Sequence, residues 1–127
     1  MKKEGTKILK AKLWKVFSEY IRRRDEGVCI SCGKVDEWQN TDAGHYVAKT
    51  KGLSIYFHEK NVHAQCTGCN RFRHGNLDAY AIALRRKYGE GILEELNEER
   101  QKTRKISAVE YKQLIEEYKA ELWLLKN

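Results

Sequence analysis

Two Cys-x-x-Cys turns lie far apart in the chain, at Cys29/Cys32 and at Cys66/Cys69. Each turn offers two thiolates at one ligand spacing, and zinc takes four soft or borderline ligands in a tetrahedron. Residues 33–65 separate the two turns, which is more than a short zinc ribbon needs. The sequence therefore predicts a structural zinc site with four thiolate ligands, and an inserted segment that this site displays.

Two disulfide bonds are the alternative use of four cysteines. The chain opens with Met1-Lys2-Lys3-Glu4 and has no apolar signal segment, which favours a reducing compartment. It also has no apolar run near the roughly 20 residues that a membrane helix requires. We expect a soluble, cytoplasmic protein whose cysteines bind metal, with no membrane partner.

Side chains that could act on a phosphodiester gather between and just after the two turns. All the histidines of the chain fall there: His45, His58, His63 and His74. A zinc ion with four thiolates has no open position, so a catalytic metal would be a second, hard ion such as Mg²⁺ or Mn²⁺ with oxygen ligands. Asp42 and Asn70 are the oxygen donors best placed to bind it.

Positive charge is concentrated in the part of the chain that holds these motifs. The net charge is +7, and residues 91–127 hold eight acidic and seven basic residues, so residues 1–90 carry +8. A basic face suits a polyanion such as DNA, although the same charge could serve solubility alone. The candidate phosphate contacts are Lys60, Arg71, Arg73 and His74. Surface charge explains any one of the first three taken singly, and His74 could instead be a second ligand or a polar helix end.

A length of 127 residues predicts one domain, residues 1–127, and helical periodicity predicts helices on both sides of the zinc segment at 28–76. The N-terminal helix covers 7–25 and ends in Arg22-Arg23-Arg24, which is either a solvated helix end or a phosphate clamp. Inside the zinc segment we expect a hairpin of two strands and then a helix. These elements are predicted at Thr41–Ala48, Leu53–Phe57 and Cys66–Arg73.

Further helices are predicted over 77–126. Asn76 could cap the helix at Leu77–Tyr88, and Ser107-Ala-Val-Glu110 is a capping box that opens the last helix. A short helix around Ile92–Leu96 lies between them. The last helix carries one apolar stripe, which either packs over the domain or forms the seam of a homodimer.

Several short runs within the zinc segment match a known pattern. These runs are Cys29-Ile-Ser-Cys-Gly33, Trp38, Asp42-Ala-Gly-His-Tyr46, Phe57, Glu59, Asn61-Val-His63, Gln65-Cys66, Cys69-Asn70 and Gly75-Asn-Leu77. Through them the chain resembles the HNH, or ββα-metal, nucleases, and within these the phage lambda NinG/Rap recombination endonuclease family. The resemblance implies an α+β fold in which a zinc-stapled, treble-clef-like ββα finger lies in a small helical domain.

The resemblance also implies a role for individual residues. His45 would be the general base that activates water, Asn61 would hold the loop that orients this base, and Asn70 would ligate the catalytic divalent ion. Many HNH enzymes have aspartate directly before the base, where this chain has Gly44. Asp42 lies two positions earlier on the same strand face, and we assign it as a ligand of the same ion.

The resulting hypothesis is a metal-dependent DNA endonuclease or nickase of branched recombination intermediates, such as Holliday junctions and D-loops, in a phage or prophage setting. The alternative is a zinc module that binds DNA or a protein without catalysis. A restriction or homing nuclease on the same motif would need an element that reads base sequence, and so short a chain offers no dedicated one.

Overall fold

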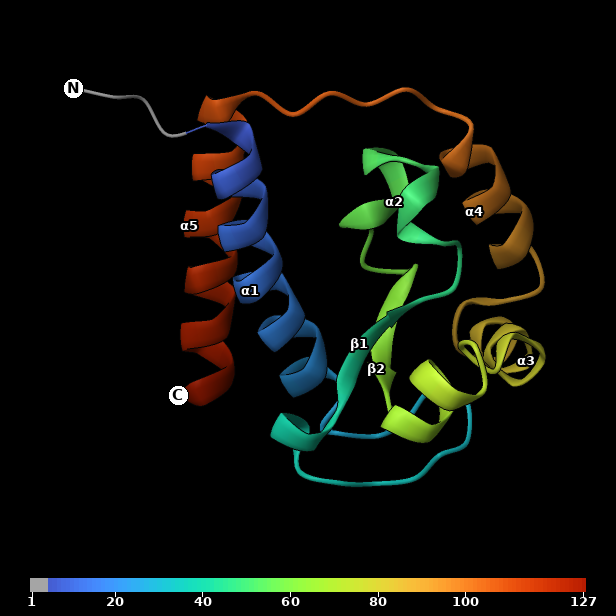
Figure 1. Cartoon of the computed structure of the whole chain (residues 1–127). Coiled ribbons are helices and arrows are strands. Elements are labelled where there is room, and N and C mark those ends of the chain that lie inside the picture. The colour runs from blue at the N-terminus through green and yellow to red at the C-terminus, as the bar shows by residue number, and fades with distance from the viewer. Residues whose placement is uncertain (1–4) are drawn as a thin grey trace.

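Two long helices stand side by side at one edge of the molecule, and a small sheet with shorter helices fills the rest (Figure 1). The computed structural model describes residues 5–127. The fold is of the mixed α+β kind. Its main elements are α1 (Thr6–Arg24), β1 (Asp42–His45), α2 (Leu53–Tyr56), β2 (Val62–Gln65), α3 (Leu77–Tyr88), α4 (Ile92–Arg100) and α5 (Ala108–Lys126).

The helix α1 is amphipathic and supplies one wall of the main core. Leu9, Leu13, Phe17 and Ile21 recur every four residues, lie on one face and are buried. They pack with Phe57 and Val62 of the central segment and with α5. The helix coincides with the predicted N-terminal helix and covers one side of the sheet.

The apolar stripe of α5 packs against α1, and the two helices run in the same direction (Figure 1). Ser107 caps α5 as the capping box predicts, since its Oγ accepts from the backbone N–H of Glu110 at 3.1 Å. Tyr111, Ile115 and Leu122 are buried in this packing. The stripe that could have formed a dimer seam is therefore used within the chain.

The prediction for the second strand was wrong. Residues 53–56 form the short helix α2, and the strand that pairs with β1 is β2, further along the chain. All four residues of β2 are buried, including the polar residues His63 and Gln65, and the strand is too short to stand out in the sequence. The two strands are antiparallel, and Asp42 pairs with Gln65, and Gly44 with His63.

The helix predicted at Cys66–Arg73 is shorter than expected. A single wide turn covers Gly68–Phe72, and the chain then passes through three residues with positive φ, His74, Gly75 and Asn76. Asn76 precedes α3, but its side chain makes no capping hydrogen bond. It donates to the Cys69 sulfur at 3.4 Å instead, so the predicted cap is wrong.

A second, smaller core joins α3 and α4 to the zinc segment, residues 28–76. Tyr80, Leu84, Ile92 and Leu96 are buried in it, and Tyr46 and Ile30 pack at its edge. Within residues 5–127, no helix has both the length and the apolar character needed to cross a membrane.

Phe17→Ala should lower the free energy of unfolding by about 3–5 kcal/mol, the usual loss for a buried phenylalanine. The ring is fully buried and contacts Phe57 and Tyr118 edge-on, with centroids 5.6 and 5.0 Å away. Urea unfolding measures the change. Ile8→Ala on the same helix is the control, because Ile8 is 55% exposed. Equal losses in the two variants would contradict this account of the core.

Candidate active site

The four cysteines come together from the two ends of the central segment. Their sulfur atoms all lie within 4.8 Å of one another. None is in a disulfide, and Cys29 and Cys69 are buried. Gly33 adopts φ +78° after the first turn, a conformation that glycine reaches without strain. Four thiols grouped this closely suit a structural metal such as zinc.

The polar surroundings of the sulfurs also suit a metal-bound thiolate cluster. The backbone N–H of Cys69 donates to the Cys66 sulfur at 3.4 Å, and the Asn76 amide donates to the Cys69 sulfur. Such donors stabilise thiolate ligands and fix their orientation. Asn76 therefore supports the cysteine cluster and does not cap α3.

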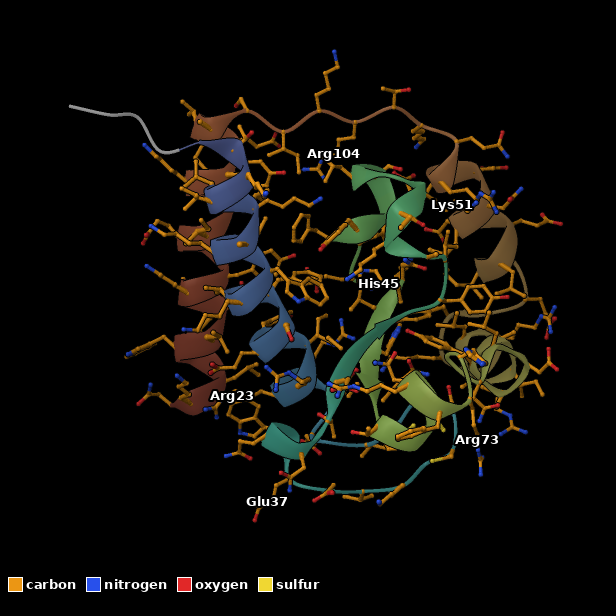
Figure 2. The ribbon with its side chains drawn as sticks, viewed as in Figure 1. Arg23, Glu37, His45, Lys51, Arg73 and Arg104 are labelled. Atoms are coloured by element: carbon orange, nitrogen blue, oxygen red, sulfur yellow. The ribbon has the colours of Figure 1, made fainter. Side chains whose placement is uncertain are left out.

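His45 ends β1 and faces α1, in the middle of the molecule (Figure 2). Its ring stacks on Trp14 at a centroid distance of 5.2 Å. Its Nε2 lies 2.8 Å from the Tyr56 carbonyl oxygen. Because a carbonyl only accepts, Nε2 must carry the proton, and Nδ1 keeps a lone pair. Nδ1 has no hydrogen-bond partner among residues 5–127.

The charge state of His45 follows from its burial. Burial lowers the pKa of His45 below its usual value, and nearby Lys49 acts in the same direction. The hydrogen bond to the Tyr56 carbonyl opposes this shift only in part. The ring is therefore neutral at pH 7 and can accept a proton at Nδ1.

Asn61 holds together the loop that carries the Tyr56 carbonyl. Its side chain is fully buried. Its Oδ1 accepts from the N–H of Val47 at 2.8 Å, and its Nδ2 donates to the carbonyls of Val47 and Ile55 at 3.0 and 3.1 Å. These bonds fix the chain after β1 against the end of α2, and thereby fix the carbonyl that orients His45.

Asp42 and Asn70, predicted to share an ion, lie side by side. The Asn70 Nδ2 donates to Asp42 Oδ2 at 3.1 Å, which leaves Asn70 Oδ1 available as an acceptor. Arg71 also binds Asp42, with Nε and Nη2 each 3.2 Å from a carboxylate oxygen. The Arg71 side chain is 66% exposed, so this ion pair is open to exchange with solvent ions or phosphate.

Asp42, His45 and Asn70 line two adjoining open cavities, of about 410 and 360 Å³. Both are lined by Trp14, Ala43, Lys49 and Asn70, and we call them together the Asn70 groove. Asp42 lines one end of the groove and His45 the other. The groove thus brings a neutral imidazole, a carboxylate and a free amide oxygen to one surface.

The predicted phosphate contacts divide into two groups. Arg71 and His74 line the Asn70 groove. Lys60 does not, because its ammonium pairs with Glu95 at 3.3 Å and lies over the Tyr88 ring. Arg73 is exposed at the outer edge of the finger (Figure 2) and does not line the groove. The structure therefore brings only two of these four residues to the site.

The three arginines at the end of α1 serve different purposes. Arg24 binds the Asp25 carboxylate and the carbonyls of Glu59 and Val62, so it is structural. Arg23 pairs with Glu19 and lies 4.2 Å from the centre of the Trp38 ring. Arg22 lines the Asn70 groove beside Asp42.

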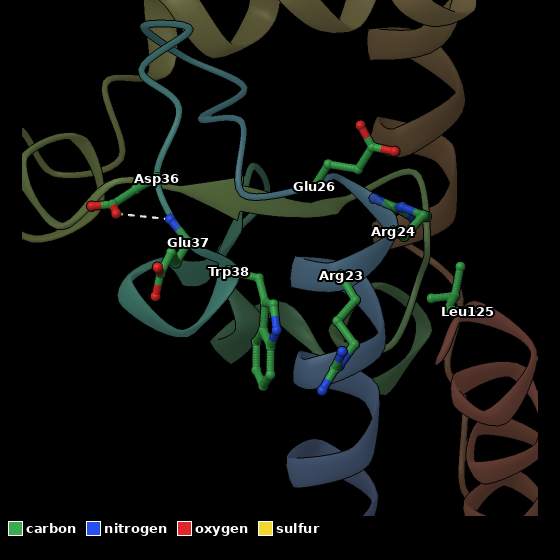
Figure 3. Close-up of a pocket in the computed structure, with 7 residues that line it drawn as sticks. All are labelled: Arg23, Arg24, Glu26, Asp36, Glu37, Trp38 and Leu125. Atoms are coloured by element: carbon green, nitrogen blue, oxygen red, sulfur yellow. Dashed lines mark hydrogen bonds between the residues drawn. The ribbon is translucent and has the colours of Figure 1, made fainter. Parts of the chain in front are cut away.

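A separate pocket of about 380 Å³ surrounds Arg23 and Trp38 (Figure 3). Its lining also includes the acidic residues Glu26, Asp36 and Glu37. Carboxylates among the arginines weaken attraction for a polyanion. This pocket is therefore a poorer phosphate site than the Asn70 groove.

Among the groove residues that were not assigned to the site, the aromatic and cationic ones are Trp14, Arg22 and Lys49. Trp14 lies in the predicted N-terminal helix, and its ring packs against the core while one face meets His45. Arg22 was considered only together with Arg23 and Arg24, as a solvated helix end or a phosphate clamp. Lys49 was placed in a hairpin connection. Their positions depend on how α1 crosses the sheet, which local patterns do not specify.

His63, by contrast, has a structural role. It is fully buried between two tyrosines, with Nδ1 3.1 Å from the Tyr80 hydroxyl and Nε2 2.8 Å from the Tyr88 hydroxyl. Burial lowers the pKa of His63 to about 3, so the ring is neutral at pH 7. It ties β2 to α3 and does not reach the groove.

Comparison with known proteins identifies relatives of this chain. A family model described as "Bacteriophage Lambda NinG protein" matches residues 2–127. Protein ninG of Escherichia phage lambda is 35% identical over 109 residues, which cover 85% of this chain and 52% of that protein. Protein ninG of Salmonella phage P22 is 36% identical over 86 residues, or 67% of this chain and 42% of that protein. The chain spans about half the length of these relatives, or less. No solved structure matches it.

Protein purified in the presence of zinc should hold about one zinc ion per chain. The variant Cys69→Ser should lose this ion together with much of the stability of the zinc segment. A colorimetric chelator assay and thermal unfolding measure both quantities. Thr67→Ala is the control, because Thr67 lies between the two cysteines of the second turn and supplies no thiolate. A Cys69→Ser protein with unchanged metal content and unfolding temperature would contradict the zinc assignment.

Proposed function

Because the chain belongs to the NinG family, we propose that it is a metal-dependent DNA endonuclease of the HNH, or ββα-metal, class. The observation that carries this proposal is the arrangement of His45. Its ring is held by a backbone carbonyl through Nε2, is kept neutral by burial, and lines a groove that also holds Asp42 and Asn70. Each feature is what a general base for phosphodiester hydrolysis requires.

In this proposal His45 activates the attacking water. The Tyr56 carbonyl holds the proton on Nε2, so Nδ1 is the atom that takes a proton from water. Trp14 stacks on the ring and limits its rotation. Asn61 fixes the Tyr56 loop, so it supports the base without touching the substrate.

Asp42 and Asn70 would hold the divalent ion, Mg²⁺ or Mn²⁺. Carboxylate and amide oxygens are suitable donors, and Mg²⁺ is often held by one or two carboxylates together with substrate phosphate. When bound, such an ion stabilises the charge that develops on the leaving 3′ oxygen. Cleavage would then give 5′-phosphate and 3′-hydroxyl ends.

The basic side chains of the groove would position the DNA backbone. Arg22, Lys49 and Arg71 line the cavity next to Asp42. A phosphate that binds Arg71 would release the Asp42 carboxylate, which then becomes free to bind a cation. Branched recombination intermediates are the substrate class that the family resemblance favours, and we include them in the proposal.

A zinc module that binds DNA without cutting it is the second candidate. The observation that favours it is the Arg71–Asp42 pair, in which both carboxylate oxygens accept from one guanidinium. If this pair persisted on DNA, Asp42 would not be available to an ion.

Purified protein should nick a labelled four-way junction with Mg²⁺ or Mn²⁺ and not with EDTA, and His45→Ala should lower the rate by at least about a hundredfold. His58→Ala is the matched control, because His58 does not line the groove. A linear duplex of the same sequence tests the preference for branches. DNA binding without nicking under either ion would favour the non-catalytic module.

The nicking rate should fall on the acid side, with a midpoint below pH 6.5. His45 must be neutral to accept a proton, and burial lowers its pKa below 6.5, so the rate rises as pH increases through that pKa. Single-turnover rates over a range of pH, at saturating ion, measure the midpoint. A rate that still rises above pH 7 would contradict His45 as the base.

A further inference from the structure

Gln65 has a buried oxygen that the fold does not satisfy. The side chain is fully buried at the end of β2. Its Nε2 donates to Ser31 Oγ at 2.8 Å and to the Gly75 carbonyl at 2.7 Å. Its Oε1 has no hydrogen-bond partner among residues 5–127. Buried carbonyl oxygens are rarely left unpaired, so this one calls for a partner outside the chain.

The orientation of this amide is fixed by chemistry. If the group were turned over, its oxygen would face the Gly75 carbonyl, which cannot donate a hydrogen bond. Nε2 must therefore point at Gly75. Oε1 is left pointing toward β1, at Gly44.

Gly44 makes room for this oxygen. A Cβ at position 44 would collide with Gln65 Oε1 and would lie 3.0 Å from Asn70 Oδ1. The amide oxygens of Gln65 and Asn70 thus both lie next to the position that a Cβ of residue 44 would take. Asp42 lies on the same face of the strand, opposite Gln65 in the register, and its carboxylate contacts Asn70.

We propose that Gln65 Oε1 is a third oxygen ligand of the divalent ion assigned to Asp42 and Asn70. The inference rests on the proposed function for the location of the ion, and it adds a residue to which no role was given above. Hard divalent cations prefer oxygen donors, and the two hydrogen bonds that Gln65 Nε2 donates fix the position of the amide oxygen in advance. Gly44, with no side chain, leaves space for Gln65 where a side chain would otherwise stand.

The test is Mn²⁺ binding to the zinc-loaded full chain, measured from the electron paramagnetic resonance signal of free Mn²⁺. Gln65→Met keeps the length of the side chain and removes the oxygen together with the hydrogen bonds of Nε2, and it should weaken Mn²⁺ binding by about tenfold or more. Ser54→Ala is the control, because Ser54 Oγ is the other buried, unpaired side-chain atom within residues 5–127. It should leave Mn²⁺ affinity unchanged.

A second design separates ligation from packing. Gly44→Asp combined with Gln65→Ala places a carboxylate in the space that the amide leaves. The double variant should bind Mn²⁺ more tightly than Gln65→Ala alone. Zinc content and circular dichroism, measured on every variant, establish that the finger is still folded.

The outcomes distinguish this inference from the nuclease proposal. Equal Mn²⁺ affinity in the wild type and Gln65→Met would overturn the inference, since the oxygen then holds only a buried water, while nicking by the wild type would still stand. Weaker Mn²⁺ binding in folded Gln65→Met, with rescue in the double variant, would support the inference even if no DNA were cut. A wild type that binds no Mn²⁺ at millimolar concentration would overturn it as well.

Discussion

The register between β1 and β2 is the constraint on which the rest of the site depends. Each strand has four residues, and a two-stranded sheet of this size is marginal by itself in water. A slip of one residue would move every side chain to the opposite face. In the observed register Asp42 and Gly44 share a face with Gln65, while His45 turns to the other face, toward Trp14.

Three sets of contacts hold this register. The cysteine cluster joins the chain before β1 to the chain directly after β2. At the other end of the sheet the buried Asn61 amide binds both the chain after β1 and the end of α2. Asp25 and Arg24, at the end of α1, contact the backbone of β2 at Ala64 and Val62. The side chains of the Asn70 groove are held in place because β1 and β2 are fixed at both ends and from one side.

The helices were the part of the fold that the sequence predicts well. The four-residue spacing of Leu9, Leu13, Phe17 and Ile21 is strong enough to identify α1, and Ser107 marks the start of α5. The sheet was harder, because β2 has only four residues and its polar members, His63 and Gln65, are buried together with Val62 and Ala64. The run at residues 53–57, rich in aromatic and branched residues, matched a strand better and yet folds as a helix.

The candidate site, like the fold, was predicted from the sequence only in part. Asp42, His45 and Asn70 belong to one motif, and the structure places all three at one groove. Lys60 is close to Asn61 in sequence, but it points toward α4 and pairs with Glu95. Arg22 and Trp14 reach the groove only because α1 crosses the sheet there. Gln65 belongs to the matched pattern, but the sequence assigned it no role, since its significance lies in one unpaired oxygen and in the absence of a side chain at Gly44.

A crystal structure of the zinc-loaded chain with Mn²⁺ and an uncleavable junction DNA would test the central claim most directly. The account predicts an anomalous Mn²⁺ peak in contact with oxygen atoms of Asp42 and Asn70, with Arg71 moved to a phosphate and His45 Nδ1 facing that phosphate. A junction phosphate far from His45, with Arg71 still bound to Asp42 and no Mn²⁺ in the groove, would contradict it.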